Sequence, residues 1–177
     1  IEGKVAIITG AGSGMGRATA HLFADEGAQV ALIDVNEAGL LAVQDELSQA
    51  GYVSRAWVLD LLDRDAIQTV VADIASHFGG IDILINNAGI QHVSPLEEFS
   101  MEKADAMWSL MLRTPFYLIQ KSLPTMYSRN WGRIIGISSI HGHIASPFKS
   151  AYVMAKHGME GLHKTVALEA GAHGVTA

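Results

Sequence analysis

The chain has 177 residues, of which 49% are hydrophobic, and its formal net charge at pH 7 is −6. This length suits one domain with a sizeable core, and the negative charge without any Lys/Arg run argues against a nucleic-acid surface. The sequence contains no cysteine, which excludes disulfides, thiolate metal sites and thiol nucleophiles.

Apolar runs in the sequence are all shorter than a membrane span. Residues 1–4 lead directly into a predicted strand, so no signal peptide is visible and the cytoplasm is the expected location. We find no internal repeat, low-complexity stretch or linker. Residues 1–177 are therefore expected to form a single domain with no membrane partner.

The first predicted elements are a strand, a glycine-rich loop and a helix. Residues 4–9 form a compact apolar run, and residues 17–26 have the apolar spacing of a helix. Between them lie Gly10, Gly14 and Gly16. Glycines let the backbone approach a pyrophosphate closely, and a helix N-terminus offers free N–H groups. The order predicts a phosphate-binding turn, although a plain flexible loop has the same composition.

A carboxylate closes the second predicted strand, which covers residues 29–33. Asp34 in this place can accept hydrogen bonds from both ribose hydroxyls of an adenosine and would repel a 2′-phosphate, which favours NAD over NADP. Asp34 could instead cap the next helix together with Glu37. Arg17 is the one nearby cation that could weaken the preference for NAD.

Strands and helices alternate through the rest of the chain, which predicts a parallel sheet with right-handed crossovers. One long helix is expected from Met101 to about Arg129, with Pro115 and Pro124 as the places where it would kink. The other helices are expected at residues 37–49, 63–78 and 151 to about 171, and the other strands at 55–59, 81–85, 134–137 and from 174.

The strand predicted at residues 134–137 ends at Ser138-Ser139, which would present hydroxyls to a crevice. Tyr152 and Lys156 lie four residues apart in a helical pattern, so they share one face. A phenol is a poor base near neutral pH, and an adjacent ammonium lowers its pKa by stabilising the phenolate. Taken alone, a Tyr-x-x-x-Lys pair is more often an ordinary surface pair.

Together these motifs resemble the short-chain dehydrogenase/reductase family. The resemblance implies an α/β fold with a Rossmann-like, doubly wound parallel sheet in three α/β/α layers, and an oxidoreductase that uses NAD. It also implies that Ser139, Tyr152 and Lys156 are the catalytic residues. The motifs are Thr9-Gly10-x-x-x-Gly14-x-Gly16, Asn86-Asn87-Ala88-Gly89, Ser139 and Tyr152-x-x-x-Lys156.

The resemblance implies a cofactor site made by the glycine loop, the ends of three strands and the catalytic helix. Asp60 and Leu61 are expected at the adenine, and Lys156 at the nicotinamide ribose. The implied cofactor-binding residues are Gly10, Ser13, Gly14, Met15, Gly16, Asp34, Asp60, Leu61, Asn87, Ala88, Gly89, Tyr152 and Lys156.

Several stretches, such as residues 87–93 and 149–152, resemble family members that act on small 3-hydroxy acids. The resemblance implies that Gln91, His141 and Lys149 hold the substrate carboxylate beside Ser139 and Tyr152. Each of the three could instead be an ordinary polar group of a loop. The remaining histidines, including His92 and His143, are expected to be structural or solvent-facing, and no spacing suggests a metal site.

Two departures from the family pattern bear on activity. Met111 stands where the family usually has an Asn that is thought to hold a water linking the catalytic Lys to solvent. A thioether accepts hydrogen bonds weakly and donates none, so this proton relay is in doubt. The chain stops at Ala177, where family members continue through a strand, a Pro-Gly loop, a substrate lid and a last strand. We therefore expect an exposed sheet edge, an open site, and a fragment rather than a damaged enzyme.

The expected function is hydride transfer between NAD and a small 3-hydroxy acid of the 3-hydroxybutyrate/acetoacetate type. One alternative is another short-chain reductase, acting on a sugar alcohol or a 3-oxoacyl group. A second alternative, suggested by Met111 and the missing C-terminal part, is a catalytically weak NAD-binding scaffold. The family usually forms tetramers through the long helix and the Tyr152 helix, so a homotetramer is expected, with a small-molecule substrate as the other partner.

Overall fold

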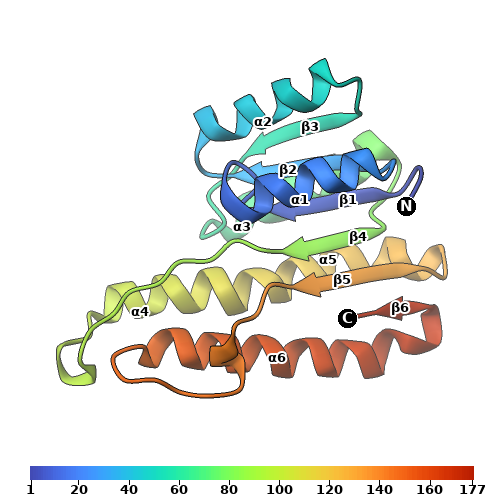
Figure 1. Cartoon of the computed structure of the whole chain (residues 1–177). Helices are drawn as coiled ribbons and strands as arrows, with labels where there is room; N and C mark the ends of the chain where they lie inside the picture. The colour runs from blue at the N-terminus through green and yellow to red at the C-terminus, as the bar shows by residue number, and fades with distance from the viewer.

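A computed structural model describes all residues, 1–177. Its centre is a six-stranded parallel sheet with helices on both faces, in the strand order β3-β2-β1-β4-β5-β6 (Figure 1). This confirms the predicted Rossmann-like architecture. The strands are β1 (Val5–Thr9), β2 (Gln29–Asp34), β3 (Ser54–Val58), β4 (Ile83–Asn86), β5 (Gly132–Gly136) and β6 (Val175–Thr176).

Six α-helices connect and cover the strands. Two of them, α1 and α2, pack on one face, while α3, α5 and α6 pack on the other. In Figure 1, α6 runs below β5 while α5 passes behind β5, and the two helices contact each other. The helices are α1 (Gly14–Asp25), α2 (Glu37–Gln49), α3 (Arg64–Phe78), α4 (Met101–Trp108), α5 (Thr114–Ser128) and α6 (Ser150–Ala170), with short helical turns η1 (Leu96–Glu98), η2 (Ser109–Arg113), η3 (Ile140–Gly142) and η4 (Gly171–His173).

Both faces of the central strands are buried, which is why these strands are apolar without alternation in the sequence. Within β1, Ile7 packs into the core under α3, α5 and α6. Its neighbours Ala6 and Ile8 pack into the core under α1 and α2. Successive side chains of a strand point to opposite faces, so one short strand supplies both cores.

The amino ends of the strands are joined by a buried carboxylate. Asp82 is 1% exposed, and it accepts hydrogen bonds from the backbone N–H of Val5 and from Arg129 Nη1 at 3.0 Å and 2.7 Å. Lys4 Nζ lies 3.7 Å from its other oxygen. Because both neighbours are cationic, the buried charge is paired. This network fixes the edge of the sheet at the amino ends of the strands. The cavity described below lies at the opposite edge, at the carboxyl ends.

The expected long helix from Met101 to about Arg129 is wrong in its middle. The chain forms α4, then the π-helical turn η2, and then α5. Pro115 lies in the first turn of α5, where its missing N–H is tolerated, and the break precedes both prolines. A π turn inserts one extra residue into a helix and leaves no signal as plain as a proline.

Smaller differences concern element ends. α1 begins at Gly14, three residues before the predicted start, because Gly14 and Gly16 belong to its first turn despite the poor helix propensity of glycine. α3 agrees with the helix predicted at residues 63–78: it begins after Asp63, which accepts hydrogen bonds from the N–H groups of Asp65 and Ala66. It ends at Phe78, and Gly79 follows with a φ of +78°.

The last strand is short. β6 pairs with Gly132 and Arg133 only, so the rest of β5 has an uncovered edge. None of the helices combines the length and the apolar composition needed to cross a membrane.

Candidate active site

A cavity of about 590 Å³ opens at the carboxyl ends of β1, β2, β3 and β4. In a parallel sheet this edge, where the strand order reverses direction around β1 and β4, is where ligands bind. Three predicted cofactor residues, Gly16, Tyr152 and Lys156, do not line the cavity. The predicted residues that do line it are Gly10, Ser13, Gly14, Met15, Asp34, Asp60, Leu61, Asn87, Ala88 and Gly89.

The glycine loop is shaped by close backbone approach. Gly10 has a φ of +68°, and a Cβ on it would lie 2.9 Å from Asn87 Nδ2. A Cβ on Gly16 would lie 1.9 Å from the carbonyl oxygen of Gly10, so Gly16 serves the packing of α1 on the loop. Ser13 precedes α1 without capping it through its side chain. The first N–H groups of α1 are therefore left for another acceptor, such as a phosphate.

Asp34 is held in the wall of this cavity by two backbone donors. Its Oδ2 accepts from Gly12 N and its Oδ1 from Asn36 N, each at 2.9 Å. The alternative that Asp34 caps α2 is wrong, because Asn36 is the capping residue. Arg17 does not line the cavity and instead pairs with Glu46 on α2, with 2.6 Å between Nη2 and Oε1.

Thr9 and Asn87 tie β1 to the segment after β4. The Thr9 hydroxyl accepts hydrogen bonds from the N–H groups of Asn87 and Ala88, each at 3.0 Å, and donates to Ile85 O. Asn87 Nδ2 donates to Thr9 O at 2.9 Å. These bonds pair the Thr9 hydroxyl with the N–H groups of Asn87 and Ala88, and they fix one wall of the cavity.

Lys156 is the buried ion next to Tyr152 on α6. It is 4% exposed, its Nζ donates to Ile137 O at 2.6 Å, and the same Nζ lies 5.6 Å from the centre of the Tyr152 ring. Burial lowers the pKa of Lys156 from its ordinary range. The surface-pair interpretation of these two residues is therefore wrong. No protein group hydrogen-bonds the phenol oxygen, which leaves it free for another partner.

Ser139 and Tyr152 are connected through His141. The Ser139 hydroxyl accepts from His141 N at 3.2 Å, which leaves its own hydrogen free to donate. The His141 ring packs edge to face against the Tyr152 ring, with 6.1 Å between centroids. Ser139 thus lies at the start of η3, a turn that packs directly on α6.

Lys149, just before α6, points its ammonium at the same histidine. Its Nζ lies 3.2 Å from His141 Nε2, while His141 Nδ1 lies 3.3 Å from Ile144 O. A carbonyl oxygen only accepts, so Nδ1 carries the hydrogen and Nε2 accepts from the lysine. The alternatives that His141 and Lys149 are ordinary polar groups of a loop are therefore incomplete. His141 fixes the Lys149 ammonium, and its ring packs against Tyr152.

Gln91 differs from the other predicted substrate residues. It is exposed on the segment after β4 and its side chain has no hydrogen-bond partner in the protein. His92 faces Lys103, with 3.5 Å between Nδ1 and Nζ, and His143 lies 3.9 Å from Glu160. No group of three or more His, Asp and Glu side chains is arranged to hold a metal ion.

Comparison with known proteins decides the family. The sequence profile of short chain dehydrogenases matches residues 4–177. The chain belongs to the short-chain dehydrogenase family. It is an oxidoreductase acting on the CH–OH group of its substrate, as its relatives and their sequence profile indicate.

Two curated relatives of this dehydrogenase carry the name D-beta-hydroxybutyrate dehydrogenase. The one from Rhizobium meliloti is 45% identical over 178 residues, covering 98% of this chain and 68% of the relative. The one from Cupriavidus necator is 41% identical over 179 residues, covering 100% of this chain and 69% of the relative. The chain thus spans about two thirds of the length of these relatives.

Two solved structures have nearly the same fold. A metagenomic short-chain oxidoreductase in complex with NADP has a TM-score of 0.95 and 33% identity, with coverage of 99% of this chain and 80% of that one. NAD⁺-bound xylitol dehydrogenase has a TM-score of 0.94 and 29% identity, with coverage of 98% of this chain and 67% of that one. The family thus includes both NAD and NADP complexes.

The cavity of this short-chain dehydrogenase also has walls that the sequence did not predict. Val35 follows the strand predicted at residues 29–33 and Leu59 ends the one predicted at 55–59, so their place at the carboxyl edge could have indicated them. Leu110 comes from the π turn η2, which no local pattern indicates. The unpredicted lining residues are Val35, Leu59, Leu62, Ile90 and Leu110.

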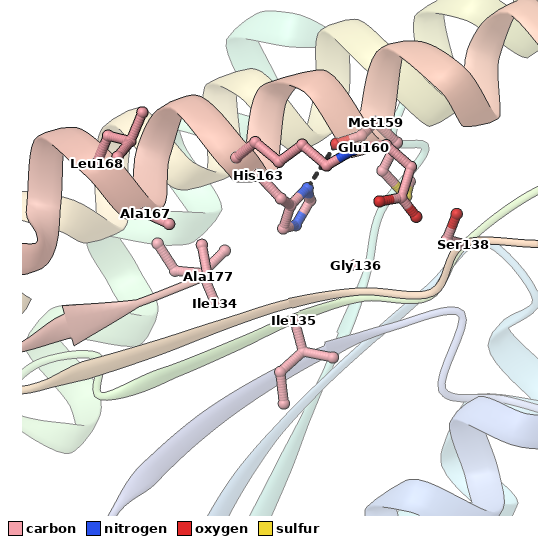
Figure 2. Close-up of a pocket in the computed structure, with 11 residues that line it drawn as sticks. Ile134, Ile135, Gly136, Ser138, Met159, Glu160, His163, Ala167, Leu168 and Ala177 are labelled. Carbon is pink, nitrogen blue, oxygen red and sulfur yellow. Dashed lines mark hydrogen bonds between the residues drawn. The ribbon is translucent and has the colours of Figure 1, made fainter. Parts of the chain in front are cut away.

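A second hollow of about 630 Å³ lies between β5 and α6 and includes none of the predicted site residues. Figure 2 shows Glu160 pointing toward Ser138 at one end, with His163 reaching down toward Gly136 in the middle. At the other end Ile134, Ala167 and Ala177 give an apolar floor. This is the uncovered edge of β5 beyond its pairing with β6.

Proposed function

We propose that the enzyme transfers hydride between NAD and a small 3-hydroxy acid, interconverting 3-hydroxybutyrate and acetoacetate. The observation that carries the proposal is the Lys149 ammonium, held 3.2 Å from His141 Nε2 while the His141 ring packs against Tyr152. A cation fixed by the same histidine that packs against Tyr152 suits a substrate whose carboxylate lies a few bonds from the reacting carbon. The names of the two curated relatives support the same substrate class.

NAD fits the cavity at the strand ends. The glycine loop admits close backbone approach, the first N–H groups of α1 lack a side-chain cap, and Asp34 presents a fixed carboxylate. Like charge would oppose a 2′-phosphate at Asp34, which supports NAD rather than NADP. We assign this role to residues 1–177 as a single cofactor-binding domain.

Tyr152 acts as the general base in the direction of alcohol oxidation. The O–H bond of the substrate breaks and its proton passes to the phenolate oxygen, while the C–H electron pair leaves as hydride and a carbonyl forms. The bound dinucleotide supplies the hydride acceptor. Lys156 stabilises the phenolate by its positive charge, since its ammonium lies over the Tyr152 ring. Ser139 donates its free hydroxyl hydrogen to the substrate oxygen and stabilises the charge that develops there.

The carboxylate end of the substrate is bound by a separate group of residues. Lys149 supplies the positive charge and His141 fixes its position. Gln91 contributes an amide donor from the exposed segment after β4. Charge-assisted bonds of this kind are stronger than neutral ones, so they select carboxylates over neutral alcohols.

The decisive experiment replaces the phenol alone. Tyr152→Phe should reduce 3-hydroxybutyrate oxidation by about 10²-fold or more, because the proton acceptor is lost. Formation of reduced nicotinamide is followed by its absorbance, and NAD binding is titrated directly in the same variant. NAD binding should stay nearly unchanged, whereas turnover equal to that of the unmodified enzyme would remove Tyr152 from this role.

Sugar-alcohol oxidation is the second candidate, since NAD⁺-bound xylitol dehydrogenase has nearly the same fold. A substrate panel of 3-hydroxy acids, polyols and 3-oxoacyl thioesters separates the two. Faster turnover of polyols or thioesters than of 3-hydroxybutyrate would favour the second class. NAD binding without turnover of any substrate would favour a scaffold, for which the buried Met111 is the supporting observation.

Assembly is the remaining part of the proposal. α5 and α6 expose large apolar side chains, among them Phe116 and Met154, which are 52% and 57% exposed. We propose that copies of the chain pack through these helices into a homotetramer. Sedimentation equilibrium measures the mass directly, and a monomer at all concentrations would reject this arrangement.

A further inference from the structure

The end of β5 and the helix α6 meet at a buried hydroxyl. Ser138 Oγ is shielded from solvent and makes no well-directed hydrogen bond within the protein. Figure 2 shows the Glu160 side chain of α6 pointing toward Ser138. This side chain is 24% exposed, and the Ser138 hydroxyl is close enough that hydrogen bonding from it lowers the pKa of the Glu160 carboxyl group. The Glu160 carboxylate is therefore the acceptor that this hydroxyl faces.

The turn η3 closes over this contact. Gly142 in the turn is buried, and a Cβ on it would lie 2.6 Å from Ser138 Oγ and 3.0 Å from Glu160 Cγ. A side chain at this position would push the hydroxyl and the carboxylate apart. Gly142 N also donates to Ser139 O at 2.8 Å, so the turn holds the backbone of the next serine as well.

Ser138 and Ser139 are neighbours in extended backbone, since Ser139 has a φ of −157° and a ψ of 164°. Successive side chains of an extended chain point to opposite sides, so fixing the first hydroxyl also fixes the direction of the second. Lys156 and Glu160 lie one turn apart on α6. Lys156 holds the carbonyl oxygen of Ile137, and Glu160 faces Ser138. The helix thus holds both residues that precede Ser139.

We propose that Glu160 is a positioning residue, whose carboxylate holds the Ser138 hydroxyl and so keeps the neighbouring Ser139 hydroxyl directed at the substrate oxygen. The proposal rests on the proposed function, in which Ser139 donates to that oxygen. Glu160 lines the hollow between β5 and α6 and lies outside the cofactor cavity. It acts through Ser138, so its loss should lower kcat and leave NAD binding unchanged.

The contact itself is tested by titrating Glu160. His143, whose Nε2 lies 3.9 Å from Glu160 Oε1, and Lys164 and His163 on α6 lower the pKa of Glu160 in the same direction as Ser138, while burial raises it. These influences remain in Ser138→Ala, where only the hydroxyl is lost. The midpoint should therefore move to higher pH in this variant. NMR of protein with isotope-labelled glutamate follows the titration, and Glu160→Gln identifies the signal. An unchanged midpoint in Ser138→Ala would overturn the proposal.

Hydrogen exchange reports on Ser139 without cofactor or turnover. The N–H of His141 donates to Ser139 Oγ at 3.2 Å, so the exchange of this amide follows the position of the hydroxyl. It should be about tenfold faster in Glu160→Leu and in Ser138→Ala, while the amides of β1 exchange as before. Glu169→Gln removes an exposed charge from the same helix and is the control. Unchanged exchange of the His141 amide in both variants would contradict the proposal.

Turnover separates positioning from a merely structural role. In both Glu160→Leu and Ser138→Ala, kcat for 3-hydroxybutyrate should fall about tenfold, and the double variant should be no slower than either single one. Glu160→Gln keeps an acceptor oxygen and should recover most of kcat. Additive losses, or a loss confined to NAD binding, would reject the role of Glu160. Absence of turnover in the unmodified enzyme despite bound NAD would instead reject the proposed function, and the exchange of the His141 amide would still decide the role of Glu160.

Discussion

The Lys156 ammonium donates a 2.6 Å hydrogen bond to the carbonyl oxygen of Ile137, which joins α6 to the chain just beyond β5. Two residues further on, this chain segment carries Ser139. In the proposed mechanism this lysine stabilises the phenolate, and its hydrogen bond also anchors the chain segment that carries Ser139. A charged donor to a buried carbonyl contributes roughly 1.5–3 kcal/mol, and its removal leaves the carbonyl unpaired.

Lys156→Met should lower turnover by about 10²-fold or more, because the phenolate of the proposed mechanism loses the positive charge that stabilises it. Stability should respond to pH in a defined direction. Burial lowers the pKa of Lys156 in the folded state, so at intermediate pH the unfolded chain binds more protons. The contribution of Lys156 to the free energy of unfolding is thus least favourable below the folded-state pKa and increases as the pH rises toward the ordinary lysine value.

Urea unfolding of the unmodified enzyme and of Lys156→Met over alkaline pH measures this contribution as a difference. The difference should shift in favour of the unmodified enzyme with rising pH. Parallel stability curves would show that the Lys156 pKa is the same in the folded and unfolded states.

Asp34→Ala should reduce the preference for NAD over NADP by about tenfold or more, because the carboxylate that repels a 2′-phosphate is removed. Binding titrations with both dinucleotides measure the ratio of affinities. Asp60→Ala is a matched control, since Asp60 lines the same cavity and accepts from Leu62 N at 2.9 Å. A preference that is unchanged in Asp34→Ala, or equally changed in both variants, would contradict the ribose assignment.

Gly16→Ala should destabilise the fold by more than about 1 kcal/mol, because its Cβ would collide with the Gly10 carbonyl oxygen at 1.9 Å. It should also weaken NAD binding, since Gly10 would have to move. Gly161→Ala is the control within a helix, where the new Cβ meets open space. That change should stabilise the enzyme by about 0.5–1 kcal/mol. Thermal unfolding compares the two variants, and equal shifts would mean that the glycine loop tolerates a side chain.

Lys149→Met should raise KM for 3-hydroxybutyrate by about tenfold or more, with a smaller effect on any neutral alcohol that the enzyme turns over, because only the carboxylate loses a charged partner. Lys121→Met removes an exposed lysine from α5 and serves as the control for net charge. Steady-state kinetics on both substrate classes give the ratio. A similar loss for acid and neutral substrates would assign Lys149 a general structural role.

Local sequence signals predicted most of the sheet and its helices. The apolar runs of the strands and the apolar spacing of the helices depend on neighbouring residues only, and β1 and α3 appear where they were expected. The cavity wall was predictable for the same reason, since residues after parallel strands meet at one edge. The π turn and the His141–Lys149 contact were not predictable from local pattern, because both depend on how η2 and η3 pack against α6. The capping of α2 by Asn36 rather than by Asp34 was also not predictable from local pattern, because backbone geometry decides it.

The sheet order described above affects how fast the chain folds. β1 pairs with β4 in the register Ala6↔Ile83, and no two strands are joined by a hairpin. Each pairing must therefore wait until an intervening helix has formed and a long loop has closed, which makes folding slow compared with a helical bundle of this size. During synthesis β1 to β4 and the helices between them emerge and can collapse while α6 is still inside the ribosome.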